Sequence, residues 1–520
     1  MDRRRFLAGG VALGGLVVAG CADDGTTAPA GPTSTSPASP STTTLPATTT
    51  MPATTTVPPT TTVGYDPSRP YWLQGGFAPV PEIGPLADLE VIGAIPPNVN
   101  GVFSRNGSNP ATGKSPHWFF GDGMVHGIEL QDGRASWYAN RYLATPLYEE
   151  GREFGDFVGP PGGAQTQANV SMLAHGGRLL ALGEVGWPYE IDPRDLSTRG
   201  PVDITGAAGS LGPNVTAHPK VDPATGLLHF FGYGFTPPYL TYYVASADGT
   251  ELLVKQDIEV AAGTMIHDFA ITERDVVFWE FPVVFDLGAA ATGAVNPFRW
   301  DASYGSRVGV MPLGGPASDM RWVEIENGYV FHGTNARRDG ERIVVDVSRI
   351  DSVFDDNDIN DVPPRLVRWE IDTAGDDLAW RAEQLSDLPL EFPEIDHRRT
   401  GLAHSVAWYT EAIDEPDGNL RFGAIVRRET ADGSETRWDP GPLYQPGEAV
   451  FVPDSAAAGE GEGWLMTFAW DATTDTSDFI ILDATDVAAG PVATVKLPQR
   501  VPFGFHGTWL AYANANTGDA

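Results

Sequence analysis

After the first 64 residues, short runs rich in β-branched and aromatic residues alternate with turn signals about every ten residues. The clearest case is the run 127–130, the turn 131–133 with its Asp-Gly pair, and the run 135–138. Asp-Gly between two such runs is the strongest short-range hairpin signal. Further Asp-Gly turns stand at 247–249 and 431–433. The pattern predicts many antiparallel strands.

The same pattern leaves the architecture open. Long helical periodicity is scarce, and no repeat with a fixed signature is visible, so a sandwich pair, a large barrel and a propeller all fit. The 60 glycines, 44 prolines and 10% aromatic residues agree with short strands and tight turns. The length of 520 residues does not determine the number of domains, because all-β barrels and propellers can use several hundred residues as one unit. The sequence predicts an all-β fold.

The charge balance disfavours one class of partner. The formal net charge is -35, and residues 1–62 hold three acidic residues against three arginines, so the excess lies in the later residues. Such a surface repels phosphate backbones, and we therefore expect no nucleic-acid binding. We interpret the acidity as a means of keeping the protein soluble, and an acidic substrate is disfavoured.

Residues 1–21 predict an export signal with a lipid anchor. An arginine cluster is followed by an apolar stretch and by Gly20-Cys21. The stretch is too short for a spanning helix, which needs about 20 apolar residues. The start RRRFL resembles the twin-arginine export motif, and VAGC resembles a bacterial lipobox cleaved before Cys21, the single cysteine. We expect an exported protein anchored to the cell membrane by lipid; an unprocessed signal anchor is the alternative.

Residues 22–63 differ in composition from everything that follows. They consist of Thr, Ser, Pro and Ala with almost no large apolar residue. Such a segment cannot bury enough surface to offset its chain entropy, so we expect a disordered, extended spacer. The remaining residues, 64–520, form the predicted functional domain.

Ten histidines raise the question of a metal site. None belongs to an HExxH helix or a CxxC-type site, so a site would have to be assembled from distant segments. Four lie at or near the end of an apolar, strand-like run: His218, His267, His332 and His506. Taken singly, each is better interpreted as a hydrogen-bonded structural histidine. The hypothesis of a metal site depends on all four together.

Several of these histidines stand in longer motifs. The motifs are residues 101–107 (GVFSRNG), 117–126 (HWFFGDGMVH), 218–220 (HPK), 267–273 (HDFAITE) and 502–507 (PFGFHG). Together they resemble the carotenoid cleavage oxygenase family, whose members include carotenoid, apocarotenoid and lignostilbene dioxygenases. The matching segments run from about Leu86 to Trp509 in the family's order.

The resemblance implies a seven-bladed β-propeller that carries Fe(II) on its axis. It makes the four histidines named above the iron ligands. It also implies three carboxylates that accept the other N–H of the ligand imidazoles: Glu184, Glu391 and Glu448. Imidazole by itself suits Zn, Cu and Ni as well, so the choice of iron comes from the resemblance.

The activity implied by the resemblance is oxidative cleavage of a carbon–carbon double bond. O₂ would convert an apolar polyene or stilbene-like substrate to two carbonyl products, and we expect the enzyme to act as a monomer. The sequence holds no dinucleotide-binding Gly-x-Gly-x-x-Gly after a strand, which agrees with a reaction that needs no redox partner. A non-oxidative isomerase or hydrolase on the same iron, or a catalytically silent ligand-binding propeller, are the alternatives.

The remaining histidines and several aromatic residues receive weaker interpretations. We expect His117 and His126 to belong to a structural hairpin around Gly121–Gly123 rather than to the metal site. Four more histidines are taken as ordinary residues: His175, His229, His397 and His404. Five aromatic residues near the expected metal could line a substrate tunnel, although more of them should be core: Phe120, Trp187, Phe269, Phe331 and Phe503.

Overall fold

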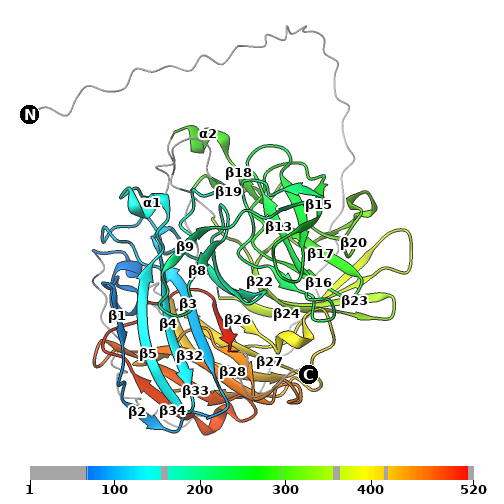
Figure 1. Ribbon diagram of the computed structural model, residues 1–520. Helices are drawn as coiled ribbons and strands as arrows, with labels where there is room; N and C mark the ends of the chain where they lie inside the picture. The colour runs from blue at the N-terminus through cyan, green and yellow to red at the C-terminus, as the bar shows by residue number, and fades with distance from the viewer. Residues whose placement is uncertain are drawn as a thin grey trace, which may run out of the picture. The chain divides into compact units, whose positions relative to one another are not determined.

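The structure is a computed structural model of the chain (Figure 1). It describes residue 66 and residues 68–153, 162–292, 294, 296–354, 363–414 and 420–512. The predicted export signal, 1–21, and the predicted spacer, 22–63, lie outside the described residues. Among the helices that are described, none has the length and apolar character needed to cross a membrane.

Seven antiparallel sheets of four to six strands form the blades of a β-propeller. Blade 1 contains β35 (Gly507–Ala511), β3 (Gly101–Ser108), β4 (Gly123–Gln131), β5 (Arg134–Tyr142) and β1 (Ile83–Leu86). Blade 2 contains β6 (Ser171–His175), β7 (Arg178–Leu182), β8 (Tyr189–Ile191) and β9 (Thr198–Pro201). Blade 3 contains β12 (Lys220–Val221), β13 (Leu228–Tyr233), β14 (Leu240–Ala245) and β15 (Leu252–Ile258).

The other four blades follow in chain order. Blade 4 contains β16 (Phe269–Ile271), β17 (Asp275–Glu280), β20 (Ser306–Pro312) and β21 (Arg321–Ile325). Blade 5 contains β22 (Tyr329–Asp339), β23 (Arg342–Ile350), β24 (Arg365–Asp372) and β25 (Ala379–Gln384). Blade 6 contains β26 (Leu390–Glu394), β27 (Val406–Asp414), β28 (Leu420–Glu429) and β29 (Glu435–Trp438). Blade 7 contains β30 (Tyr444–Pro446), β31 (Val450–Pro453), β32 (Gly463–Asp471), β33 (Thr476–Asp483), β34 (Pro491–Lys496) and β2 (Val91–Gly93).

Smaller elements connect the blades. Two short strand pairs are β10 (Thr205–Gly206) with β11 (Gly209–Ser210), and β18 (Val283–Phe285) with β19 (Phe298–Trp300). The α-helices of the described residues are α1 (Pro146–Glu149) and α2 (Leu287–Ala291). Single 3₁₀ turns are η1 (Tyr71–Leu73), η2 (Gly75–Phe77), η3 (Trp118–Phe120), η4 (Ala317–Asp319), η6 (His397–Arg399) and η7 (Val487–Ala489). The predicted all-β fold is confirmed.

The three Asp-Gly turns each join two antiparallel strands, as predicted. They connect β4 to β5, β14 to β15 and β28 to β29. In the first turn Asp132 and Gly133 both have positive φ, 50° and 73°. Asp tolerates this left-handed conformation and Gly adopts it without steric cost, which is why the pair specifies a tight hairpin.

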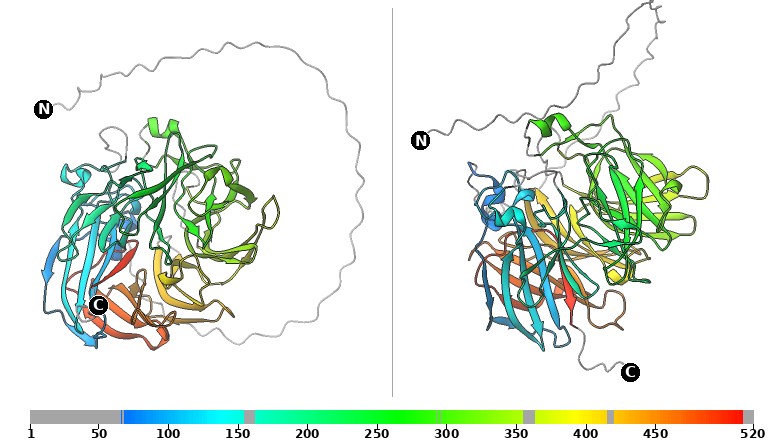
Figure 2. Two further views of the ribbon diagram at one scale, coloured as in Figure 1. Left: turned by 45° about the vertical axis from the view of Figure 1, so that its right-hand side comes forward. Right: turned by 45° about the horizontal axis from the view of Figure 1, so that its top comes forward.

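Both ends of the described chain close the ring of blades. The C-terminal strand β35 pairs with β3, and the N-terminal strand β2 pairs with β34 in blade 7. Figures 1 and 2 show the blue N-terminal strands beside the red C-terminal ones. The strands at both ends of the described chain are thus joined to the ring by backbone hydrogen bonds.

The first strands of the blades gather at the centre of the ring. β16 lies against β22, β22 against β26, and β35 against both β31 and β6. Farther out, neighbouring blades pack face to face through aromatic side chains. Phe231 of blade 3 meets Phe269 and Phe278 of blade 4 edge-on, and Trp279 meets Trp369 of blade 5 at 5.9 Å between ring centroids. This packing fixes where each central strand end lies.

Candidate metal centre

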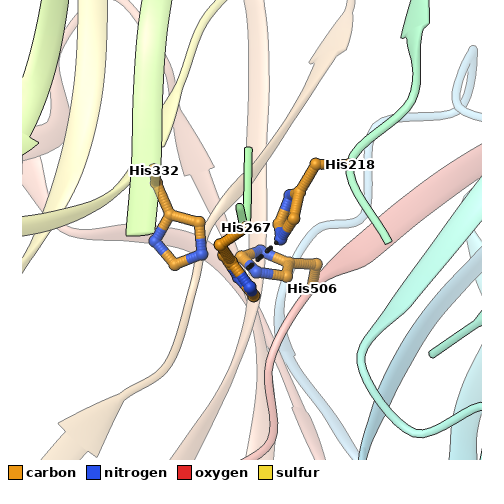
Figure 3. Close-up of side chains that lie close together, drawn as sticks. All are labelled: His218, His267, His332 and His506. Atoms are coloured by element: carbon orange, nitrogen blue, oxygen red, sulfur yellow. Dashed lines mark hydrogen bonds between the residues drawn. The ribbon is translucent and has the colours of Figure 1, made fainter. Parts of the chain in front are cut away.

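Four histidines converge where the central strands begin (Figure 3). His218 and His267 lie two residues before β12 and β16, His332 lies within β22, and His506 directly precedes β35. One nitrogen of each ring lies within 4.8 Å of one nitrogen of each of the others. Residues that are far apart in the sequence therefore present four imidazoles to one point, as the resemblance implies.

The nitrogens that face this point lack ordinary partners. Nε2 of His218 and Nε2 of His267 lie 2.9 Å apart. Nε2 of His332 is buried and has no hydrogen-bond partner among the described residues. Buried polar atoms normally find a partner, so inward-facing nitrogens without one are what a bound cation would satisfy. The arrangement fits a metal ion held by four imidazoles.

Three carboxylates stand behind three of the imidazoles. Nδ1 of His267 lies 2.9 Å from Glu184 Oε2. The corresponding distance is 2.6 Å from His332 to Glu391 and 2.6 Å from His506 to Glu448. A carboxylate at Nδ1 places the ring proton there, and Nε2 keeps a free lone pair for a metal. These glutamates come from blades 2, 6 and 7, which carry none of the four histidines.

Each carboxylate is itself held in place. Glu391 accepts a hydrogen bond from the backbone N–H of Phe392 at 2.6 Å, and Glu448 accepts one from the N–H of Gly507 at 2.6 Å. Glu184 instead accepts from the hydroxyl of Tyr233 at 3.0 Å. Phe392 adopts a φ of 49°, a left-handed conformation that a bulky residue rarely takes. Such strain is often found where a side chain must be aimed at a site.

Burial controls the protonation of these rings. Burial, followed by the neighbouring imidazoles, lowers the pKa of His218 and of His332 well below the usual value. For His267 burial acts in the same direction and is the largest single cause, but the carboxylates of Glu184, Asp268 and Glu391 together outweigh it and raise the pKa. Burial raises the pKa of Glu391 to about 7. His218 and His332 are therefore neutral at pH 7, the form that binds a metal.

Comparison with known proteins places the chain in a family. Residues 77–511 match the model of the RPE65 family, described as retinal pigment epithelial membrane protein. A carotenoid cleavage oxygenase from Mycobacterium tuberculosis is 36% identical over 503 residues, covering 85% of this chain and 97% of that protein. The chain belongs to the carotenoid oxygenase family.

Other relatives in the carotenoid oxygenase family are named for isoeugenol and for lignostilbene. An isoeugenol monooxygenase from Pseudomonas nitroreducens is 33% identical and covers 82% of this chain and 95% of its own length. The crystal structure of a Pseudomonas brassicacearum lignostilbene dioxygenase superposes with a TM-score of 0.75 at 28% identity, over 87% of this chain and 99% of that one. The similarity covers nearly the whole length of each relative, so it includes the centre of the propeller.

Aromatic rings surround the four imidazoles of this carotenoid oxygenase family member. Phe331 meets His267 edge-on at 5.3 Å, and Phe392 stacks on His332 at 5.6 Å. Phe119 lies between Phe331 and Phe505, at 6.0 and 5.7 Å. The sequence prediction included Phe331 and missed the other three. Phe392 and Phe505 directly follow or precede a predicted site residue, a signal that would have found them.

The other four predicted aromatic residues pack in the core or beside it rather than against the four imidazoles. Phe269 is fully buried and stacks on Phe278, away from the imidazoles. Phe503 packs in a cluster with Phe77 and Phe422. Trp187 donates to the carbonyl of Gly212 and packs beside blade 3, and Phe120 is half-buried at the end of η3.

The remaining histidines lie outside the four-histidine cluster. His117 accepts from the N–H of Phe119 and caps η3, and His126 in β4 bonds the hydroxyl of Tyr138 at 2.9 Å. The predicted hairpin around Gly121–Gly123 is wrong, because these residues lead from η3 into β4. The other histidines have local partners: His175 with Gly226, His229 with Tyr242, His397 with Glu394 and His404 with Asn335.

Proposed function

We propose that the chain is a non-haem Fe(II) dioxygenase that cleaves a carbon–carbon double bond of a carotenoid, apocarotenoid or stilbene-like molecule. The observation that carries the proposal is the convergence of His218, His267, His332 and His506 on one point. Relatives named carotenoid cleavage oxygenase and isoeugenol monooxygenase, and the similar lignostilbene dioxygenase structure, support the substrate class.

The residues have separate tasks in this proposal. The four imidazoles would hold the iron as uncharged ligands and would leave its charge at +2, and Glu184, Glu391 and Glu448 would fix the ring orientations. Bound iron supplies the binding and activation of O₂. The four histidines would be the protein's ligands to the ion, and O₂ would have access to it beside them.

The aromatic side chains suit an apolar alkene. Phe331 and Phe392 contact the imidazoles directly, and Phe119 extends this surface. Such rings exclude water from the reacting double bond and bury the substrate's flat surface. Both oxygen atoms of O₂ end in the two carbonyl products, so no external reductant is needed.

Two measurements test the proposal on the full-length protein. The first is the iron, zinc and copper content per chain after anaerobic purification; about one iron per chain is expected. The second is incubation with an apocarotenal and with a hydroxystilbene under ¹⁸O₂, with immediate reduction of the products to trap the label. Label in both products supports a dioxygenase. Conversion without label would overturn the dioxygenase proposal in favour of an isomerase or hydrolase. Binding of the substrate without conversion would overturn it in favour of a catalytically silent propeller.

We also propose that the enzyme is exported, anchored by lipid at Cys21 and active as a monomer. The support is the arginine cluster, the VAGC sequence and the Thr-rich residues 22–63 that follow. Export in the folded state would let the protein acquire iron in the cytoplasm. The test is fractionation of cells that produce the chain or its Cys21→Ser variant. The variant should leave the membrane fraction, and its retention there would contradict the anchor.

A further inference from the structure

His218 differs from the other three imidazoles in how it is supported. His267, His332 and His506 each place Nδ1 within 2.9 Å of a carboxylate. The described residues offer no such carboxylate to His218, whose side-chain hydrogen bond is the contact with His267 at Nε2. The position of this ring therefore depends on the segment that carries it.

Two contacts tie that segment to the segment that carries His267. The hydroxyl of Thr216 accepts a hydrogen bond from the N–H of His218 at 3.0 Å and donates to the carbonyl of His267 at 3.1 Å. Nζ of Lys220, two residues after His218, lies 2.7 Å from Oδ1 of Asp268. Thr216 precedes His218 and Lys220 follows it, so the segment is held on both sides of the histidine.

Asp268 connects more than these two segments. Its side chain is only 1% exposed. Oδ1 also accepts from the N–H of Phe269, and Oδ2 accepts from the N–H of Gly333, each at 2.8 Å. Gly333 directly follows His332. A single buried carboxylate thus joins the chain segments that carry three of the four imidazoles.

The negative charge of Asp268 makes these contacts dependent on Lys220. A buried carboxylate is stable only when it is paired and its oxygens are hydrogen-bonded. Lys220 supplies the cation, and its Nζ also lies 5.9 Å from the centre of the Phe269 ring. Removal of Lys220 would leave a charge uncompensated beside the imidazoles, and the surrounding strands would shift to let water reach it.

We propose that Asp268 and Lys220 are positioning residues, whose buried ion pair sets His218 relative to His267 and His332 in place of the carboxylate that His218 lacks. The inference rests on the proposed metal site. Residues behind metal ligands change metal affinity by about 10–100-fold when replaced. Lys220→Met should therefore weaken metal binding by about 10-fold, and Asp268→Asn by about 100-fold.

The test uses the full-length, metal-free protein titrated anaerobically with Fe(II), and with Co(II) because its visible spectrum reports ligand geometry. Lys496→Met is the matched control: Nζ of Lys496 lies 2.6 Å from Oδ2 of Asp478, a 2% exposed carboxylate in blade 7. Both lysine variants should lower the thermal unfolding temperature to a similar extent. Lys220→Met should in addition weaken the binding of both metals and alter the Co(II) spectrum. Lys220→Arg should recover most of the metal affinity.

Three outcomes would overturn the proposal. Wild-type affinity and spectrum in Lys220→Met would show that His218 does not depend on the ion pair. Equal losses of affinity in Lys220→Met and Lys496→Met would assign the effect to general stability. A wild-type protein that binds neither metal would instead remove the proposed function, on which the inference depends.

Discussion

The individual residues of the site could be predicted to different degrees. The four histidines stand in recognisable motifs, and the structure brings all four rings together with the three glutamates behind them. The aromatic surroundings could not be predicted as well. Phe269 directly follows Asp268 yet points into the core, whereas Phe392 reaches His332 through a left-handed backbone. Which way a ring points depends on backbone conformation that no short motif reports.

His267→Ala should abolish both metal retention and turnover while the fold persists. Loss of one of four imidazoles removes a ligand and leaves Glu184 without its partner. His229→Ala is the control, since His229 is also buried but bonds Tyr242 in blade 3. It should lower the unfolding temperature and keep the metal. Metal content by elemental analysis and circular dichroism check both variants; normal turnover by His267→Ala would refute the ligand assignment.

Glu184→Gln should weaken metal affinity or rate by about 10–100-fold. An amide accepts the His267 N–H less strongly than a carboxylate does and no longer makes that ring more basic. Tyr233→Phe removes only the hydroxyl that holds Glu184, so its loss should be smaller in the same assay. Fe(II) titration and kcat/KM measure both variants. A larger effect from Tyr233→Phe than from Glu184→Gln would contradict this order.

At the scale of elements, local signals predict local structure. The Asp-Gly turn between β4 and β5 was predicted correctly because a two-residue hairpin is specified by the φ values of its own residues. The other two Asp-Gly pairs lie in longer loops, where Gly249 and Gly433 have positive φ. The number of blades could not be derived in the same way. Blade strands range from the two residues of β12 to the eleven of β22, so no repeat of constant length marks the blade in the sequence. The family resemblance supplied the count of seven.

Gly133→Ala should lower the free energy of unfolding by about 1 kcal/mol or somewhat more. Gly133 has a φ of 73°, and an added Cβ would lie 3.4 Å from the carbonyl oxygen of Ile95. Gly375→Ala is the matched control in the turn between β24 and β25, where φ is not positive and the nearest atom is 3.5 Å from the Cβ. Urea unfolding of both variants measures the difference, and equal stabilities would exclude backbone strain as the cause.

At the scale of the whole molecule, the site forms only when the seven blades are assembled into a ring. Each of the seven blades contributes one of the seven residues: the histidines come from blades 1, 3, 4 and 5, and the glutamates from blades 2, 6 and 7. A change in the position of any blade therefore moves a ligand or its support. Blade 1 differs from the other histidine-bearing blades, because the strand that follows its histidine, His506, pairs with β3 from the far end of the chain, whereas β12, β16 and β22 each pair with the next strand.

Trp509→Ala tests this coupling between closure and metal binding. Trp509 lies in β35, pairs with Phe103 and packs against the apolar cluster between blades 1 and 7. Truncation of a fully buried tryptophan costs about 3–5 kcal/mol, and this half-buried one should cost about 2 kcal/mol. Trp380→Ala should cost a similar amount, because Trp380 is half-buried in β25, at the far edge of blade 5. Only Trp509→Ala should also weaken Fe(II) binding, since it loosens the strand that follows His506. Urea unfolding and Fe(II) titration measure the two effects separately, and equal metal affinity in the two variants would mean that the central strands hold the site without help from the closing strand.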